Sequence, residues 1–93
     1  MSAPHELRQV EICNEKGLHA RASARLVEVA ERFDADAEVR HDGQAAAGDS
    51  IMGLLMLAAS RGSLIEIETR GPQAKELADA LEALVADKFG EEF

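Results

Sequence analysis

The strand signal in this chain is an alternation of apolar and polar side chains over short segments. In the segment LRQVEIC, Val10 and Ile12 fall on one face and the polar side chains between them fall on the other, which is typical of a half-buried strand. The pair Asp42-Gly43 is a strong signal for a two-residue hairpin turn between two further strands. Strands are predicted over residues 7–13, 37–41, 44–47 and 64–69.

The helix signal is a recurrence of apolar side chains every three or four residues. Between Ala20 and Phe33 the apolar positions follow this spacing, and charged side chains line the opposite side, as in an amphipathic helix. Asp49 or Ser50 is suited to cap a second helix over residues 51–59. The third helix is expected to open at Gly71-Pro72 and to end at Gly90. Its apolar stripe consists of Leu77, Leu81, Leu84 and Val85.

The order of the predicted elements is strand, helix, strand, strand, helix, strand, helix. An antiparallel sheet with helices packed on one face is the natural arrangement for this order, which places the chain in the α+β class. Because the chain has 93 residues, it has room for one domain and not for two independent cores. Residues 1–5 and 91–93 are expected to be frayed tails.

The second predicted helix, IMGLLMLAA, is apolar on all sides, unlike the other two. A single-layer sheet can cover only one side of it, so one set of its side chains is expected in the core and the other at the surface. An exposed set with two methionines is typical of a docking surface for other proteins; the alternative is that a loop or the last helix covers it. One side carries Gly53, Leu54, Leu57 and Ala58, and the other carries Ala59 and the expected docking residues Ile51, Met52, Leu55 and Met56.

The chain is acidic, with a formal net charge of −8. This balance argues against non-specific binding to nucleic acid or to an anionic membrane, because both need a positive field. The charge is unevenly distributed, since residues 1–32 are neutral overall. Within the stretch around KGLHARASARL, Glu15 is outnumbered by Lys16, Arg21 and Arg25. This part of the chain therefore favours an anion.

The cysteine count and the apolar segments bear on the compartment. Cys13 is the only cysteine, so an internal disulfide framework is excluded. No apolar segment has the length of a signal peptide or of a membrane span. We therefore expect a cytoplasmic protein that does not insert into membranes, and nothing in the chain demands more than a monomer.

His19 directly precedes the first predicted helix, and its default role is that of an ordinary surface residue. A metal ligand would need companions, and no pair among His5, Cys13 and His41 has a recognised ligand spacing. A general base would need a nucleophile, but Ser23 would point along the helix, and no carboxylate is clearly placed to orient the ring. Neither a metal site nor a cofactor is therefore expected.

The role that uses every neighbour of His19 is that of a phosphorylated histidine. A neutral imidazole is a competent nucleophile near physiological pH. The phosphoryl group that it gains would lie beside the free N–H groups at the start of the helix, which favour anions. Arg21 lies in that first turn and can donate paired hydrogen bonds to phosphate oxygens. This combination predicts a carrier that holds a phosphoryl group briefly.

These residues carry a resemblance to a known family. The chain resembles the HPr family, the histidine-containing phosphocarriers of the bacterial phosphotransferase system. The resemblance covers nearly the whole chain and is carried by two motifs, GLHARASARL and, about thirty residues later, GDSIMGLLMLAA. The resemblance implies an open-faced sandwich of four antiparallel strands with three helices on one face. It also implies that His19 is phosphorylated on Nδ1 by phospho-enzyme I, itself charged from phosphoenolpyruvate, and that Arg21 stabilises the phosphate.

The resemblance also implies partners. The exposed side of the second helix would dock enzyme I and the IIA proteins that accept the phosphoryl group, so the protein would be a carrier and not an enzyme. Ser50 matches the serine that HPr kinase/phosphorylase modifies in many bacteria, although Ser50 also has a plain structural role as a helix cap. Asp49 beside it would repel an incoming phosphate, at an energetic cost of less than about 1 kcal/mol.

One departure from the family pattern leaves the pathway open. Family members usually have proline directly after the arginine, and here Ala22 frees one more backbone N–H, so a somewhat looser turn with the same chemistry is expected. The carrier belongs either to sugar transport or to a regulatory, nitrogen-related phosphotransferase chain. A more distant alternative is a small ferredoxin-like binding module, but the loop from Asn14 to His19 lacks the cysteine pair of a metal carrier.

Overall fold

The computed structural model describes residues 4–93 and contains one four-stranded antiparallel sheet. The strands are β1 (His5–Glu11), β2 (Asp36–His41), β3 (Gln44–Ala47) and β4 (Leu64–Arg70), in the spatial order β1-β4-β2-β3. The helices are α1 (Ala20–Ala30), α2 (Ile51–Met56) and α3 (Ala74–Ala86), followed by a short 3₁₀ turn, η1 (Lys88–Gly90). The α+β class and the predicted element order are confirmed.

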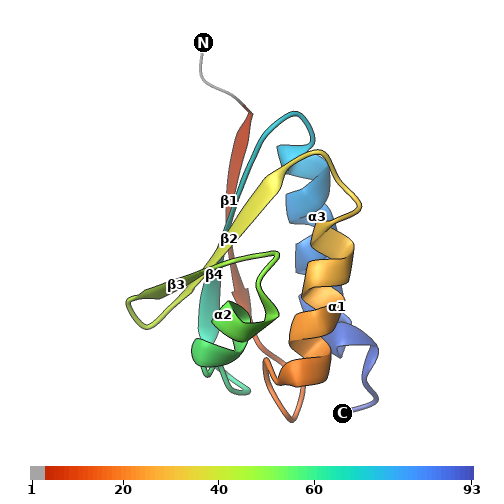
Figure 1. Cartoon of the computed structure of the whole chain (residues 1–93). Coiled ribbons are helices and arrows are strands. Elements are labelled where there is room, and N and C mark those ends of the chain that lie inside the picture. Colours follow the sequence, from red (N-terminus) through yellow and green to blue (C-terminus); the bar gives the residue numbers. More distant parts are fainter. Residues whose placement is uncertain (1–3) are drawn as a thin grey trace.

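The helices cover one face of the sheet (Figure 1). The core between the two layers consists of the inward side chains of the strands, the apolar stripes of α1 and α3, and buried side chains of α2 and of the loops. Ile65 and Ile67 of β4 are buried, and the residues between and beside them are more exposed, as in a half-buried strand. The largest fully buried apolar side chains are Ile12, Leu26, Val39, Leu54, Ile65, Ile67, Leu77, Leu81 and Val85.

The hairpin between β2 and β3 has the turn that its sequence predicts. Asp42 and Gly43 have φ values of 50° and 80°, the left-handed conformation that both central residues of a type I′ turn need. His41 and Gln44 are paired directly on either side of them. The Asp-Gly signal therefore fixes the register of this edge of the sheet.

All three helices are shorter than predicted. The periodicity placed the end of the first helix at Phe33, but α1 ends at Ala30, and the following N–H groups of Arg32 and Phe33 bond three residues back instead of four. The helix expected over 51–59 ends at Met56, because the chain reverses at Ala58, where φ is 52°.

The third helix starts later than predicted. Pro72 lies before α3, not in its first turn, and the residue that caps the helix is Gln73. The Gln73 side chain accepts a hydrogen bond from the backbone N–H of Asp34 at 2.7 Å, and the Gln73 N–H donates to the Asp34 carbonyl at 3.0 Å. A contact between distant segments therefore sets where α3 begins.

The expectation of frayed tails is wrong for the described parts of both. His5 is the first residue of β1, paired with Arg70. At the other end, the backbone N–H of Glu15 donates to the carbonyl of Phe93 at 3.0 Å, and the chain end lies beside the start of α1 (Figure 1). Residues 1–3 lie outside the described part of the chain.

Candidate functional site

His19 caps the N-terminus of α1. Its backbone is extended, and its ring Nδ1 accepts a hydrogen bond from the backbone N–H of Arg21 at 3.2 Å. A side-chain acceptor at this position satisfies one of the N–H groups that the first turn of a helix leaves without a carbonyl partner. About a quarter of the His19 side chain (24%) remains exposed. The ring is therefore fixed by the helix end and still reachable from outside.

The loop before His19 is fixed by a close approach of two backbone segments. Gly17 has a φ of 67°, and a Cβ at this position would lie 2.5 Å from the carbonyl oxygen of Ala59, so only glycine fits. The next residue, Leu18, is buried, and its N–H donates to the same carbonyl at 2.9 Å. The segment after α2 thus determines where His19 enters α1.

The second ring nitrogen of His19 faces a carboxylate. Nε2 is hydrogen-bonded to Oε2 of Glu91, which follows η1 at the far end of the chain. A carboxylate can only accept, and a backbone N–H can only donate, so the neutral ring carries its proton on Nε2 and a lone pair on Nδ1. The expectation that no carboxylate orients the ring is therefore wrong.

Glu91 is itself fixed by a buried amide. Asn14, which is fully buried, donates through Nδ2 to Glu91 Oε1 at 2.9 Å and to the carbonyl of Gly17 at 2.8 Å. Burial alone would raise the pKa of Glu91, but donation from Asn14 and His19, together with the charge of Arg21, outweighs burial and lowers that pKa. Glu91 is therefore a carboxylate when it contacts the ring.

Arg21 lies in the first turn of α1, with an exposed side chain that makes no ion pair among the described residues. It lines a cavity of about 410 Å³ together with Lys16 and Arg25. This cavity is also lined by Glu15, Glu91, Glu92 and the buried Phe89. The local excess of positive charge seen in the sequence is therefore balanced at this end of α1 by acidic side chains from the other end of the chain.

Ala22 occupies the third position of α1 and is fully buried. Its backbone N–H belongs to the first turn, whose N–H groups have no carbonyl of the same helix to bind. The structure therefore keeps a helix-competent residue, with its N–H, at the position where the family pattern has proline.

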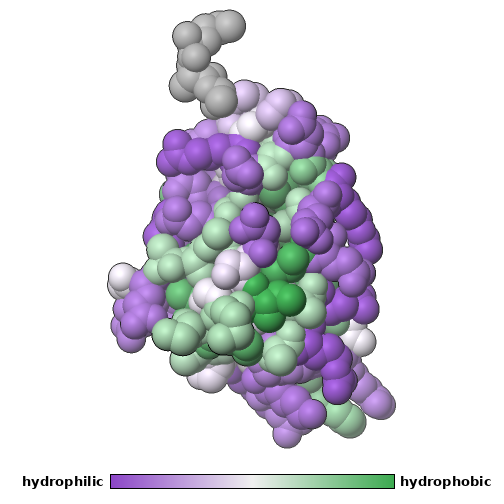
Figure 2. All heavy atoms as spheres, viewed as in Figure 1, coloured by the Kyte–Doolittle hydropathy of each residue, from purple (hydrophilic) through white to green (hydrophobic). Residues whose placement is uncertain are grey.

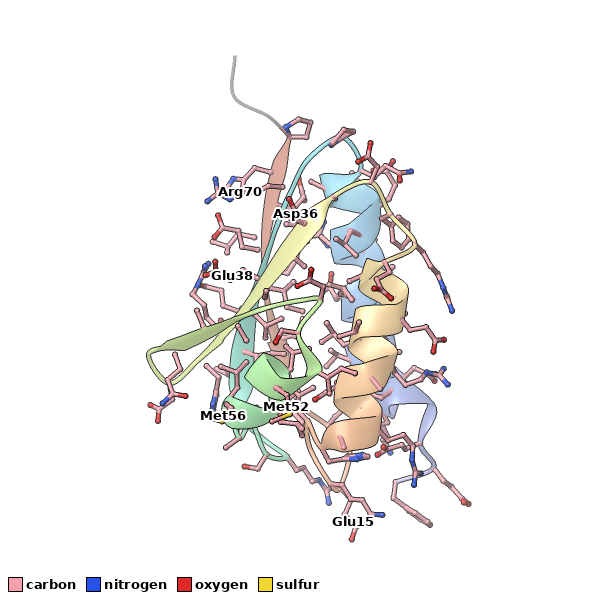
Figure 3. All side chains as sticks on the ribbon, viewed as in Figure 1. Glu15, Asp36, Glu38, Met52, Met56 and Arg70 are labelled. Atoms are coloured by element: carbon pink, nitrogen blue, oxygen red, sulfur yellow. The ribbon has the colours of Figure 1, made fainter. Side chains whose placement is uncertain are left out.

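The apolar surface predicted on the second helix is present. Ile51, Met52 and Met56 are 40%, 69% and 72% exposed, whereas Leu55 is only half-buried at the edge of this group. Figure 2 shows this apolar area over α2, surrounded by hydrophilic residues, and Figure 3 shows Met52 and Met56 on it. We call Ile51, Met52, Leu55 and Met56 the α2 patch.

The start of this helix agrees with expectation, and its end does not. Ser50, not Asp49, is the cap, because its Oγ accepts from the backbone N–H of Gly53 at 3.0 Å. Ala58 was expected in the core and is exposed, whereas Ala59 was expected at the surface and is buried. Both exchanges follow from the reversal at Ala58, which ends the helical periodicity.

The remaining histidines and the cysteine lie apart. His5 pairs with Glu68 on the sheet, Cys13 donates its thiol to the Val85 carbonyl at 3.2 Å, and His41 contacts the Leu57 carbonyl at 2.9 Å. Within residues 4–93, no group of three or more His, Cys, Asp or Glu side chains is arranged to hold a metal ion. No helix in this same part of the chain is long and apolar enough to cross a membrane.

Two residues of the site, Asn14 and Glu91, have no signal in the sequence that would connect them with His19. Glu91 is separated from His19 by 72 positions, and one acidic residue after a helix is ordinarily solvated. Only the packing of the segment around η1 beside the start of α1 brings Glu91 to Asn14 and His19.

Comparison with known proteins points to one family. The family model described as the PTS HPr component phosphorylation site matches residues 7–87. The phosphocarrier protein HPr of Cupriavidus necator is 46% identical over 84 residues, which cover 90% of this chain and 94% of that protein. The phosphocarrier protein NPr of Shewanella violacea is 43% identical over 84 residues, or 90% of this chain and 92% of that protein.

A solved structure of the same family has the same fold. The crystal structure of HPr-C-His from Thermoanaerobacter tengcongensis superposes with a TM-score of 0.89 and 35% sequence identity. The match covers 95% of this chain and 99% of that one. The similarity therefore extends over the sheet, all three helices and the loop that carries His19.

Proposed function

Because the chain belongs to the HPr family of phosphotransferase-system phosphocarriers, we propose that His19 is the residue that carries the phosphoryl group. The phosphocarrier role follows from family membership. The assignment to His19 is supported mainly by one observation: Nδ1 presents its lone pair at the N-terminus of α1, beside the N–H of Arg21. An anion formed at this atom lies where a helix end stabilises negative charge.

The proposed transfer needs no proton from the protein. The Nδ1 lone pair attacks the phosphorus held by phospho-enzyme I, the new N–P bond forms, and the bond between phosphorus and the donor breaks with its electrons returning to the donor. The Arg21 N–H that bonded Nδ1 then turns to a phosphoryl oxygen, and the guanidinium of Arg21 binds further oxygens. The same steps in reverse pass the group to a IIA-type protein, so His19 is consumed and regenerated as a substrate.

The docking of both partners is assigned to the α2 patch. It offers an exposed apolar surface on a chain that is otherwise strongly charged, and surfaces of this kind are typical contact sites for other proteins. The loop at His19 and the segment after α2 are hydrogen-bonded through Leu18 and Ala59. A partner seated on the patch would therefore lie next to the phosphorylated ring.

Ser50 is proposed as a regulatory phosphorylation site for HPr kinase/phosphorylase. Its side chain is partly exposed and lies at the start of α2, directly before the patch. A phosphate here would add about two negative charges beside Asp49 and at the edge of the docking surface. Enzyme I should then bind more weakly. Incubation with the kinase and ATP should label wild type but not Ser50→Ala, and equal labelling of both would exclude this site.

The acceptor assay tests the whole proposal. The protein is incubated with phosphoenolpyruvate and enzyme I, and one acid-labile phosphate per chain is expected. Addition of a IIA protein should remove it, and comparison of a sugar-specific with a nitrogen-related IIA protein identifies the pathway. Uptake at an unchanged rate by His19→Ala would show that the assignment is wrong.

A further inference from the structure

Glu91 contacts both the ring of His19 and a buried amide. Its Oε2 faces His19 Nε2, and its Oε1 accepts from Asn14 Nδ2 at 2.9 Å. Only 14% of the Glu91 side chain is exposed. Both carboxylate oxygens are thus used within the protein, which is unusual for an acid so near the end of an element.

The backbone that delivers Glu91 is in an unfavourable conformation. After α3, Lys88, Phe89 and Gly90 have φ values of 56°, 56° and 80°. Two consecutive residues with side chains in the left-handed region are rare, and they persist only where the surroundings impose them. Here the burial of Phe89 and the hydrogen bond between Glu15 and Phe93 impose this reversal, and it places Glu91 on the ring.

Asn14 orients Glu91, but its burial destabilises the folded state. The residue is fully buried, and within residues 4–93 its Oδ1 has no hydrogen-bond partner. A buried acceptor without a partner destabilises the folded state. A smaller apolar residue would avoid that cost, but it would leave Glu91 without the donor that fixes its orientation.

We propose that Glu91, oriented by Asn14, is a positioning residue that keeps the proton of His19 on Nε2 and the lone pair on Nδ1. This inference rests on the proposed phosphorylation of His19 and adds a residue to it. In many nucleophilic enzymes a carboxylate orients a histidine that serves as the base for a separate nucleophile. Here a carboxylate orients the histidine in the same way, but the histidine ring is itself the nucleophile.

The same contact acts after transfer. Attack through Nδ1 by a ring that retains its Nε2 proton produces a positively charged phosphoimidazolium. The Glu91 carboxylate offsets that charge and accepts the Nε2–H throughout, so no proton leaves the ring. Because the protonated ring is the better leaving group, Glu91 also favours onward transfer to the acceptor.

The test compares Glu91→Gln with Glu92→Gln, which removes the neighbouring exposed charge. In the ¹⁵N spectrum of the neutral ring, at about pH 8.5, wild type and Glu92→Gln should show Nδ1 unprotonated and Nε2 protonated. Glu91→Gln, whose amide can also donate, should shift towards a mixture of both tautomers. Its maximal rate of phosphoryl uptake from phospho-enzyme I should fall about ten-fold or more with little change in KM, and Glu91→Asp should recover part of that loss.

The outcomes separate the two proposals. Failure of wild type to take up phosphate, or uptake by His19→Ala, contradicts the proposed function itself. If wild type is phosphorylated on His19 but Glu91→Gln keeps the wild-type tautomer or the wild-type rate, only the role of Glu91 is refuted. A slower Glu91→Gln with an unchanged tautomer also refutes positioning, because the loss would then arise elsewhere.

Discussion

The single residues of the site divide into those that a local pattern reveals and those that it does not. His19 and Arg21 lie two positions apart at a helix start, and helix geometry alone places one ring nitrogen and one guanidinium at the same end. Their positions could therefore be predicted from the sequence. Asn14 and Glu91 become part of the site only through a contact between residues far apart in the sequence. No local sequence pattern can predict that contact.

Replacement of Arg21 should separate chemistry from stability. Its side chain is exposed and makes no ion pair within the described residues, so Arg21→Ala should change the free energy of unfolding by no more than about 0.5 kcal/mol. Phosphoryl transfer from enzyme I should be slower, because one donor to the phosphate oxygens is lost. Stopped-flow or quench measurements of transfer, with thermal unfolding, check both statements.

Arg32→Ala is the matched control. Arg32 follows α1 at its far end and pairs with Glu28 at 3.3 Å, so its loss removes the same charge from the protein without touching the site. Equal transfer rates for Arg21→Ala and wild type would remove the proposed role of Arg21. Equal slowing in both variants would assign the effect to net charge.

At the scale of helices and strands, the sequence predicts the type and order of the elements correctly. It predicts the residues at which the elements begin and end less accurately. Period and turn chemistry are local, which explains why the Asp42-Gly43 hairpin and the stripe of α1 are correct. The ends depend on contacts from elsewhere. Gln73, directly before α3, is held by hydrogen bonds to Asp34, and the reversal of the chain at Ala58 stops α2. Neither contact can be read from the segment in which the helix lies.

The α2 patch predicts a partner effect without a folding effect. Met52 is 69% exposed, so Met52→Lys should leave the free energy of unfolding within about 0.5 kcal/mol of wild type. Docking of enzyme I should weaken, because a charge enters an apolar contact, and its KM for the variant should rise. Leu64→Lys is the control, since Leu64 is also apolar and 55% exposed but belongs to β4. The same KM for both variants and wild type would contradict the docking assignment.

The outer face of the sheet predicts a dependence of stability on pH. Glu68 on β4 accepts hydrogen bonds from side chains of neighbouring strands, and donation from Arg40, then from His5, lowers the pKa of Glu68. Figure 3 shows Glu38 and Arg70 on the side of the sheet that faces away from the helices. The ionisable side chains that pair with Glu68 or with its partners on this face are His5, Glu38, Arg40, Glu66 and Arg70.

The sign of this effect follows from the lowered pKa. The folded state favours the ionised form of Glu68, so its contribution to stability is present above the unfolded pKa, about 4.3. That contribution is lost as the pH falls through the lower, folded value. The stability difference between wild type and Glu68→Gln should therefore shrink on acidification, measured by urea unfolding from about pH 6 to about pH 3. A difference that stays constant over this pH range would contradict it.

At the scale of the whole molecule, the fold gathers distant segments around one ring. The loop at Asn14, the start of α1, the segment after α2 and the residues after η1 all meet at His19. The fold class could be predicted because element order limits the layer arrangements. The packing of the chain end against this site could not, since frayed ends are the ordinary case.

The proposed chemistry of His19 is tested by determining which ring nitrogen carries the phosphorus. ¹⁵N-labelled protein is phosphorylated with phosphoenolpyruvate and enzyme I, and the bonded nitrogen is identified by ³¹P–¹⁵N coupling. One phosphohistidine, His19, is expected, with phosphorus on Nδ1 and the proton retained on Nε2, which faces Glu91. Phosphorus on Nε2, or on any other side chain, would contradict this chemistry.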